Sequence, residues 1–292
     1  MRALVTGTTG FIGAALANGL RNDGDVWELN RWQRNVPNEI VQDLSAPLQR
    51  SALPDKIDVV VHCAGVIDTD GHSDAYFRAV NIEATRSLIN YAATAKAGHF
   101  VLLSSGAIYG PLAEAAAEST LAKPSGLYAQ TKWAAEQTVL DHAGDLAVTI
   151  LRLYFPYGPR QTARLIPQLL KEVRLGHSII LRGGPDGPLV NPIFVDDLVD
   201  CVRAVIRYCG PRARIYNVAG PEVVSIRAVA AMIGALLGTA PLFELDRSAP
   251  SRGNWVGAIS KLKSELGFVP TTTMRDGLTA MFRDPACNSC AD

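Results

Sequence analysis

Residues 1–20, "MRALVTGTTGFIGAALANGL", run from an apolar stretch through Gly7, Gly10 and Gly13 into a stretch rich in alanine and leucine. This order predicts a strand, a tight turn and a helix, and the free N–H groups and positive dipole end of such a helix bind an anion. Gly7 would allow the turn, Gly10 would let a pyrophosphate approach the backbone, and Gly13 would let the helix pack on the strand. The spacing is GxxGxxG, one residue longer than GxGxxG, and a purely structural turn would use the same glycines.

The rest of the chain alternates strand-like runs with helical stretches. Continuous apolar runs such as "VVVHCAG" (59–65) and "FVLLSS" (100–105) are typical of strands buried on both faces. Strands that alternate with helices indicate an α/β fold with a Rossmann-type doubly wound parallel sheet. Composition shifts near Pro156 to Pro- and Gly-rich loops, and we expect a smaller C-terminal substrate-binding domain there. We expect a dinucleotide-binding domain of residues 1–162 plus 193–220 and a substrate domain of residues 163–192 plus 221–292. The later helices are expected at 165–175, 195–208, 226–237 and 260–266.

Composition excludes several classes of partner. Lys plus Arg and Asp plus Glu number 28 each, so no net field attracts nucleic acid or a membrane surface. The amino terminus has no secretory pattern and no apolar stretch reaches the roughly 20 residues of a spanning helix, so a cytoplasmic protein is expected. Five scattered cysteines do not suggest a disulfide framework, and the CxxC at 287–290 lacks a second ligand pair, so no metal is expected.

A catalytic group is indicated by "LYAQTK" (127–132), in which Tyr128 and Lys132 share one face of a helix. A nearby ammonium would favour the phenolate of a tyrosine that otherwise ionises near pH 10. Ser105 ends a strand, where doubly wound folds bind ligands. Chance pairing on a helix surface and a capping serine are the alternative interpretations.

The segment "TGTTGFIG" (6–13) resembles the TGxxGxxG turn of the extended short-chain dehydrogenase/reductases, which include the NAD-dependent epimerases and dehydratases of nucleotide sugars. The resemblance extends over nearly the whole chain: "LRLYFPYGPRQ" (151–161) is similar to the family's LRYFNVYGPRQ, and "ISKLKSELGFVP" (259–270) to its DISKAKRLLGWxP. It implies a nucleotide-sugar substrate and a homodimer formed through helices around 83–96 and 127–142.

The resemblance also implies roles for individual residues. Tyr128 exchanges a proton with a sugar oxygen, Lys132 holds the nicotinamide ribose, and Ser105 orients the substrate oxygen. Asp43 matches the acid that holds the adenine amino group. The full set expected to bind the cofactor is Gly7, Gly10, Phe11, Ile12, Gly13, Asn30, Arg31, Asp43, Leu44, Cys63, Ala64, Gly65, Asn81, Tyr128 and Lys132.

The end of the second strand, "WELNRWQRN" (27–35), bears on the choice of cofactor. Asn30 stands where an acid would bind the ribose of NAD, and Arg31 follows directly, with Arg34 close behind. Guanidinium groups suit a phosphate, so the pattern favours NADP over NAD. A solvated arginine after a strand is the alternative, and Glu28 is expected to point elsewhere by strand alternation.

The departures from the family lie in the substrate half. Phe155 stands where an Asn usually contacts the nucleotide sugar, and Val190 where an Arg often meets its diphosphate. The substrate-binding residues are therefore expected to be Ser105, Phe155, Arg160, Asn191 and Arg252, although plain surface arginines would look the same; Arg182 is a further candidate. Gly106 and Ala107 replace the Asp-Glu pair of family dehydratases, which argues against 4,6-dehydration.

Together these features predict an NAD(P)-dependent 4-ketoreductase or 4-epimerase of a sugar, most simply a nucleotide sugar. Two alternatives remain open: a reductase of a non-sugar carbonyl compound, and a dinucleotide-sensing protein without chemistry.

Overall fold

The computed structural model describes residues 1–67, 71–208, 210, 212–246, 248 and 253–284. The chain divides into two compact units. The first unit comprises Met1–Ile108, Leu121–Arg152 and Val199–Tyr216; the second comprises Tyr109–Thr120, Leu153–Leu198 and Asn217–Asp292. Each unit is described separately below.

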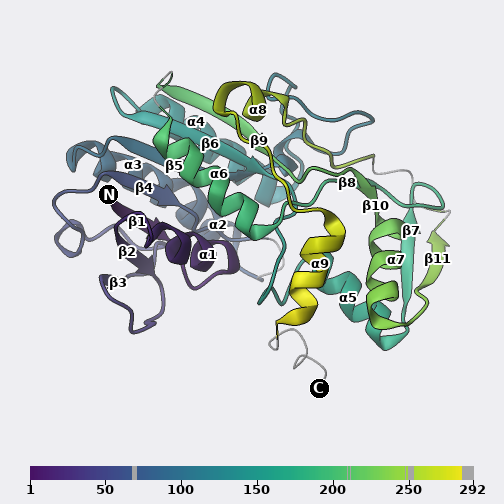
Figure 1. The fold of residues 1–292 in the computed structure, drawn as a ribbon. Coiled ribbons are helices and arrows are strands. Elements are labelled where there is room, and N and C mark those ends of the chain that lie inside the picture. The colour runs from purple at the N-terminus through teal and green to yellow at the C-terminus, as the bar shows by residue number, and fades with distance from the viewer. Residues whose placement is uncertain (68–70, 209, 211, 247, 249–252, 285–292) are drawn as a thin grey trace. The chain divides into compact units, whose positions relative to one another are not determined.

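Strands and helices mostly alternate along the chain (Figure 1). The strands are β1 (Arg2–Thr6), β2 (Asp25–Asn30), β3 (Glu39–Val41), β4 (Val59–His62), β5 (His99–Ser105), β6 (Ala147–Leu153), β7 (Ser178–Arg182), β8 (Leu189–Val190), β9 (Ala213–Val218), β10 (Val224–Ser225) and β11 (Leu242–Asp246). The helices are α1 (Phe11–Leu20), α2 (Asp74–Arg78), α3 (Ala84–Thr94), α4 (Gly126–His142), α5 (Leu165–Leu175), α6 (Val195–Arg207), α7 (Ile226–Leu237), α8 (Ser260–Leu266) and α9 (Met274–Arg283), with short turns η1 (Arg50–Ala52), η3 (Ala79–Glu83) and η4 (Gly106–Tyr109). The alternation is interrupted where β3 follows β2, β8 follows β7 and β10 follows β9 directly, and two helices, α8 and α9, come last.

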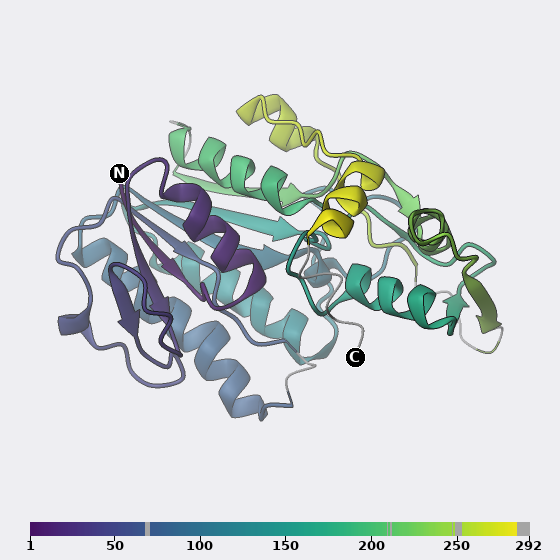
Figure 2. The same ribbon diagram turned by 60° about the horizontal axis from the view of Figure 1, so that its bottom comes forward.

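The first unit is built on a seven-stranded sheet with the order β3-β2-β1-β4-β5-β6-β9. The pairs β1–β2, β1–β4, β2–β3 and β4–β5 are all parallel. The order reverses between β1 and β4, so this is the switch point beside which doubly wound sheets bind their ligands. Helices α1 and α6 lie on one face of the sheet and α3 and α4 on the other (Figure 2). This is the Rossmann-type arrangement predicted from the alternation of strands and helices.

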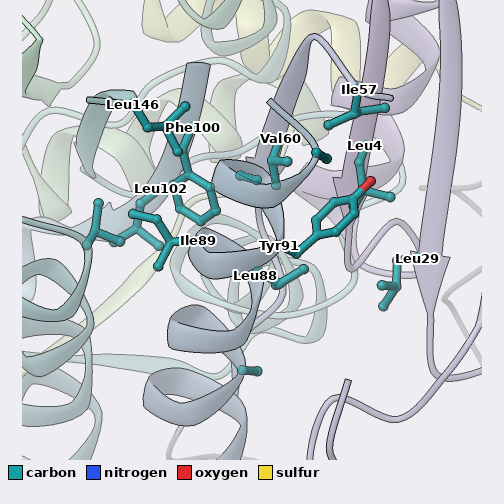
Figure 3. Packing of buried hydrophobic residues seen from close by; sticks show 14 of the residues in the cluster. Leu4, Leu29, Ile57, Val60, Leu88, Ile89, Tyr91, Phe100, Leu102 and Leu146 are labelled. Carbon is teal, nitrogen blue, oxygen red and sulfur yellow. The ribbon is translucent and has the colours of Figure 1, made fainter. Parts of the chain in front are cut away.

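The core of the first unit explains why its strands read as unbroken apolar runs. Leu4, Val60, Phe100 and Leu102, from three neighbouring strands, are completely buried. Leu88, Ile89 and Tyr91 of α3 pack in the same cluster (Figure 3). Because helices cover both faces of the sheet, β1, β4 and β5 have almost no solvent face to which a polar alternation would correspond.

The second unit has its own apolar core and two small sheets. β7 pairs with β11 in parallel, and β8 pairs with β10 in an antiparallel manner. Helices α5, α7 and α9 contribute most of the core, which contains Ile166, Leu169, Val229, Ile233, Leu278 and Met281. Helix α5 is bounded by Gly176, which adopts φ 65°, as is usual for a residue after a helix end.

Several local predictions need correction. The glycine of "LRNDG" (20–24) predicts that the first helix closes at Gly24, but α1 ends at Leu20 with Arg21 as its cap, and Gly24, at φ 149°, lies in the turn before β2. The short strands β3, β8 and β10, the strands β7 and β11, and helix α9 were not predicted. Strands of two or three residues are too short for any periodicity to show. The helices predicted at 165–175, 226–237 and 260–266 are confirmed.

Within the described part of the chain, no helix is both long and apolar enough to cross a bilayer. No group of three or more His, Cys, Asp or Glu side chains is placed for metal binding among the described residues. The CxxC at 287–290 lies outside them.

Candidate active site

Two glycines in the turn after β1 are required by the fold, because neither position has room for a side chain. Gly7 adopts φ 72°, and a Cβ placed on it would lie 2.7 Å from the Cα of Ala64. A Cβ on Gly13 would lie 2.3 Å from the carbonyl oxygen of Gly7. No side chain fits at either position, so these two glycines allow β1, α1 and the segment after β4 to approach one another.

Gly10 differs, because its backbone conformation suits any residue and an added side chain would crowd its surroundings far less than at Gly7 or Gly13. Its φ is −84°, and an added Cβ would meet only the Gly7 oxygen, at 3.3 Å. It is the N-cap of α1 and provides no side-chain cap for the helix. A glycine that is not needed for folding, at an uncapped helix start, is what a phosphate approaching the backbone would require. The turn thus fits a dinucleotide pyrophosphate.

Asn30, at the carboxyl end of β2, is buried and holds the glycine turn. Its Oδ1 accepts hydrogen bonds from Thr8 Oγ1 at 2.9 Å and from the N–H of Thr9 at 3.0 Å. Its Nδ2 is a buried donor with no partner in the described structure. Buried donors are rarely left unpaired in native proteins, and an acceptor oxygen of a bound dinucleotide would satisfy this one.

The two arginines after β2 have different surroundings. Arg34 Nη1 donates to the carbonyl oxygen of Thr8 at 2.8 Å and pairs with Glu28 at 2.7 Å. Glu28 is fully buried, pairs with Arg21 as well, and its carboxylate contacts the Thr8 hydroxyl of the glycine turn. The expectation that Glu28 points elsewhere is therefore wrong, because Glu28 and Asn30 are two residues apart in β2 and share one face of the sheet. Arg31 instead donates to the hydroxyl of Tyr76 at 2.6 Å, and its guanidinium lies 5.1 Å from the ring centre of Trp32, which is 64% exposed.

Lys132 is the best-defined member of the candidate catalytic group. It is buried, and its Nζ donates to the carbonyl oxygen of Leu103 at 2.6 Å. Burial lowers the pKa of its ammonium to about 8, while Cys63 and Glu136 oppose that shift. The bond joins α4 to β5 two residues before Ser105, so the sequence-distant segments 103–105 and 128–132 belong to one site.

Ser105 and Tyr128 flank this connection. Ser105 is the last residue of β5, and its Oγ accepts a hydrogen bond from the N–H of Ala107 at 3.1 Å. Tyr128 lies in the first turn of α4, four residues before Lys132, and its ring packs against the cluster of Val66, Phe77 and Val80. Both side chains are partly exposed, as groups that meet a substrate must be.

Asn81 lies in a π-helical turn, η3, and clamps the segment after β4. Its Oδ1 accepts from the N–H of Val66 at 2.8 Å, and its Nδ2 donates to the carbonyl oxygen of Val66 at 3.1 Å and to Thr131 Oγ1 at 3.0 Å. π-Helical turns occur frequently at functional sites. The clamp holds the segment Cys63–Gly65 between the glycine turn and Lys132.

The other predicted cofactor residues lie around the same strand ends. Burial raises the pKa of the Cys63 thiol to about 12, so this side chain is a neutral wall of the site. Asp43 accepts a hydrogen bond from the N–H of Ser45 at 2.8 Å, which shapes the turn after β3, and Leu44 is buried beside it.

Apart from Ser105, which lies in the first unit, the predicted substrate residues belong to the second unit. Asn191 is buried, and its amide exchanges two hydrogen bonds with the backbone of Gly257, at 2.8 and 3.1 Å. Arg160 is exposed, with its Nε 3.7 Å from Asp284. Phe155 adopts φ 43°, a left-handed conformation that suits Asn far better than Phe, and its ring packs on the core of the second unit. Arg252 lies outside the described residues.

Val190, where the family often has an arginine, is buried in the core of the second unit. It pairs with Val224 and forms a bridge with Trp255. An apolar side chain in this place provides packing and no charge for a diphosphate.

The sequence reasoning missed a set of buried polar side chains behind the site. Thr6, His62 and Thr85 are at most 1% exposed and are hydrogen-bonded to one another. The sequence does contain a signal for them: a histidine and two threonines stand inside otherwise apolar or helical stretches. Polar groups buried there need hydrogen-bond partners, so these three residues could have been expected to pair.

Comparisons with known proteins agree with this geometry. The profile of the NAD dependent epimerase/dehydratase family matches residues 3–219. The protein named uncharacterized UDP-glucose epimerase YtcB of Bacillus subtilis is 26% identical over an alignment of 303 residues, gaps included, which covers 96% of this chain and 96% of that protein. A dTDP-glucose 4,6-dehydratase of Streptomyces griseus is 30% identical over 234 residues, 76% of this chain and 70% of that protein.

Among solved structures, MoeE5 in complex with UDP-glucuronic acid and NAD has a TM-score of 0.85 and 26% identity, and the match covers 96% of this chain and 97% of that one. The fold and the site thus define a Rossmann-type enzyme that uses a nicotinamide dinucleotide. The chain belongs to the NAD-dependent epimerase/dehydratase family, whose members modify nucleotide sugars. The predicted fold class and family are confirmed.

Proposed function

We propose that this enzyme transfers hydride at the C4 position of a sugar, as a 4-ketoreductase or a 4-epimerase, with Tyr128 as its acid–base group. The observation that carries the proposal is the buried Lys132 ammonium, bonded to the Leu103 carbonyl between Ser105 and the helix face of Tyr128. Relatives named as an epimerase and a dehydratase support chemistry that begins with hydride removal. Gly106 and Ala107 supply no acid for expelling a hydroxyl, so dehydration is not proposed.

A nicotinamide dinucleotide held by these residues would supply the group that accepts and returns the hydride. Tyr128 takes the proton of the C4 hydroxyl as the hydride leaves, or gives a proton to the C4 keto oxygen in the opposite direction. The Ser105 hydroxyl donates a hydrogen bond to that oxygen and stabilises its developing charge. With a pKa of about 8, Lys132 is mostly charged at neutral pH, favours the phenolate of Tyr128 and holds the nicotinamide ribose.

The proposed cofactor site uses the predicted residues of the first unit. The glycine turn holds the pyrophosphate, Asn30 and Arg31 lie at the adenosine ribose, and Asp43 lies at the adenine. NADP is proposed over NAD because Glu28, the acid nearest the end of β2, is buried between two arginines, which leaves Arg31 to meet a 2′-phosphate. The NAD bound in the MoeE5 complex describes the cofactor of MoeE5 and is not carried over to this chain.

The proposed division of labour follows the sequence-based domains. Residues 1–162 with 193–220 bind the dinucleotide, and residues 163–192 with 221–292 bind the substrate. Phe155, Arg160, Asn191 and Arg252, with Ser105, are the proposed substrate contacts. A homodimer formed through the helices around 83–96 and 127–142 remains part of the proposal.

A second candidate, a reductase of a non-sugar carbonyl compound, is favoured by two features of the second unit. Val190 is buried and apolar, and Phe155 packs on the core instead of offering a polar amide. Both positions therefore lack the polar contacts that family members offer to a nucleotide sugar.

The test is to incubate the purified protein with a panel of UDP-, dTDP- and GDP-linked sugars and their 4-keto derivatives, with NADH or NADPH. Absorbance at the reduced nicotinamide band and product mass are followed together. Product without net cofactor loss identifies an epimerase, and stoichiometric NADPH oxidation identifies a ketoreductase. Activity on simple ketones alone would favour the second candidate, and no turnover with any compound would contradict both.

A further inference from the structure

A chain of buried hydrogen bonds runs behind the candidate site from the glycine turn to the catalytic helix. It begins at Thr6, the residue before Gly7, and passes through His62 and Thr85 to Asn81. Thr6, His62, Thr85 and Asn81 are all at most 2% exposed. Since each lies on a different element or turn, the chain connects β1, β4, α3 and η3.

The direction of the first bonds is fixed by the valence of one hydroxyl. Thr6 Oγ1 accepts from the N–H groups of Cys63 and Ala64, each at 3.1 Å. Both of its lone pairs are then used, so its own proton must go to His62 Nδ1, 2.8 Å away. His62 Nδ1 is therefore an acceptor, and the ring carries its proton on Nε2.

The remaining bonds follow from that tautomer. His62 Nε2–H donates to Thr85 Oγ1 at 3.0 Å, and Thr85 Oγ1 donates to the carbonyl oxygen of Asn81 at 2.8 Å. The Asn81 amide donates to Thr131 Oγ1 at 3.0 Å, and Thr131 Oγ1 donates to the carbonyl oxygen of Tyr128 at 3.0 Å. Every hydroxyl in this path both donates and accepts, so one neutral His62 tautomer satisfies the whole chain.

The surroundings of His62 keep its ring in the neutral form. Burial, and next the Lys132 ammonium, lower the pKa of His62 to about 3, so the ring stays neutral in neutral and mildly acidic solution. The Cys63 thiol beside it is neutral as well. A protonated His62 would present a proton to Thr6 that this hydroxyl, already an acceptor twice, has no lone pair to receive.

We infer that His62 and Thr85 are positioning residues: through Thr6 and Asn81 they fix the segment Cys63–Gly65 and the glycine turn in the shape that binds the dinucleotide. The inference rests on the proposed function. Loss of the Thr85 hydroxyl leaves His62 Nε2–H unpaired in the core, the ring turns away from Thr6, and the two N–H groups of Cys63 and Ala64 lose their anchor. The turn cannot move closer to this segment, because Gly7 lies so near Ala64 that even a Cβ on Gly7 would be only 2.7 Å from the Ala64 Cα.

The chain offers a matched control at the opposite end of β5. His99, the first residue of that strand, is also buried, and it shares a hydrogen bond of 2.8 Å with Thr149 Oγ1. Its pKa is lowered to about 4 by burial and then by Arg214. Each pair joins a buried histidine to a buried threonine hydroxyl, and only the first pair lies behind the site; His99 Nε2 also lies 3.3 Å from Arg214 Nη2.

The experiment compares Thr85→Val, Thr85→Ser and Thr149→Val in the full chain. Thermal unfolding and the dissociation constants of NADPH and NADH, from fluorescence titration, are measured for each. We expect Thr85→Val and Thr149→Val to lower Tm by similar amounts, whereas only Thr85→Val weakens dinucleotide binding, by about tenfold. Thr85→Ser restores the hydroxyl and should bind within about twofold of the wild type.

Equal dissociation constants for Thr85→Val and Thr149→Val would overturn the inference while leaving the proposed function standing. A wild-type chain that binds neither NADPH nor NADH would overturn the proposed function and this inference with it. If Thr85→Val does not fold, the pair His62→Gln and His99→Gln gives the same comparison from the histidine side, with weaker dinucleotide binding expected for His62→Gln alone.

Discussion

At the scale of single residues, the site depends on which charges are already paired inside the protein. Glu28 is buried and pairs with both Arg21 and Arg34. The guanidinium of Arg31 has, among its described hydrogen bonds, only one to the neutral hydroxyl of Tyr76. An arginine bonded to a tyrosine hydroxyl keeps its charge available for an anion. Choice between the two dinucleotides therefore falls mainly to this one side chain.

The variant Arg31→Ala should lose this preference. We expect its dissociation constant for NADPH to rise about tenfold, because a charge-assisted hydrogen bond to phosphate is lost, and that for NADH to change by less than about threefold. Titration of both reduced cofactors measures this directly. Arg212→Ala, which removes an exposed arginine paired with Asp145, is the control and should bind both as the wild type does. Equal losses for the two cofactors would contradict the assignment of Arg31.

At the scale of elements, the junction of β1 and α1 separates the glycines that build the turn from the one that serves the ligand. Gly13→Ala would push a Cβ to 2.3 Å from the Gly7 oxygen and should destabilise the fold by about 1–3 kcal/mol. Gly10→Ala meets a contact of 3.3 Å only and should unfold close to the wild type, yet bind NADPH at least about tenfold more weakly. Thermal unfolding and cofactor titration of both variants distinguish these effects, and a Gly10→Ala protein with unchanged affinity would show that no ligand approaches there.

Most of the elements that build the site could be predicted from the sequence, because their signals are local. The strand runs of β1, β4 and β5 are long and apolar, and the spacing of Tyr128 and Lys132 needs only a helix. The relation between Lys132 and the Leu103 carbonyl could not be predicted, since it depends on how α4 packs on β5. The buried chain through His62 was missed for the same reason: its partners are 23 and 56 residues away in sequence.

The second unit was harder to predict. Its strands β8 and β10 have two residues each, and Phe155 holds a backbone conformation that no Phe prefers, φ 43°. Such features are imposed by tertiary packing against local preference. The substrate residues were therefore expected from the family pattern alone. The structure adds that both the oxygen and the nitrogen of the Asn191 amide are hydrogen-bonded to the backbone of Gly257.

At the scale of the whole molecule, two buried neutral histidines should make stability depend on pH. The pKa values of His62 and His99 are lowered to about 3 and about 4, so in mildly acidic solution the unfolded chain binds protons that the folded chain does not. Stability from this source is nearly complete at about pH 7.5 and falls as the pH drops through the unfolded-state pKa of about 6.5, with a slope that approaches about 1.4 kcal/mol per pH unit for each histidine below about pH 5.5. Chemical denaturation at pH 5.0, 5.5, 6.0 and 6.5 measures the slope.

The variant His99→Gln isolates one of the two contributions. Its stability should depend on pH about half as steeply as that of the wild type in this range, whatever its absolute stability. A slope equal to that of the wild type would mean that His99 is protonated in the folded protein.

The central claim is that Tyr128 exchanges the proton during hydride transfer, and the direct measurement is the single-turnover rate of Tyr128→Phe with the substrate that the panel identifies. The variant keeps the ring that packs on Val66 and Phe77 and removes only the hydroxyl. We predict NADPH affinity within about threefold of the wild type and a hydride-transfer rate at least about 100-fold lower, since general acid–base catalysis contributes that much or more. A Tyr128→Phe enzyme that transfers hydride at the wild-type rate would contradict the account.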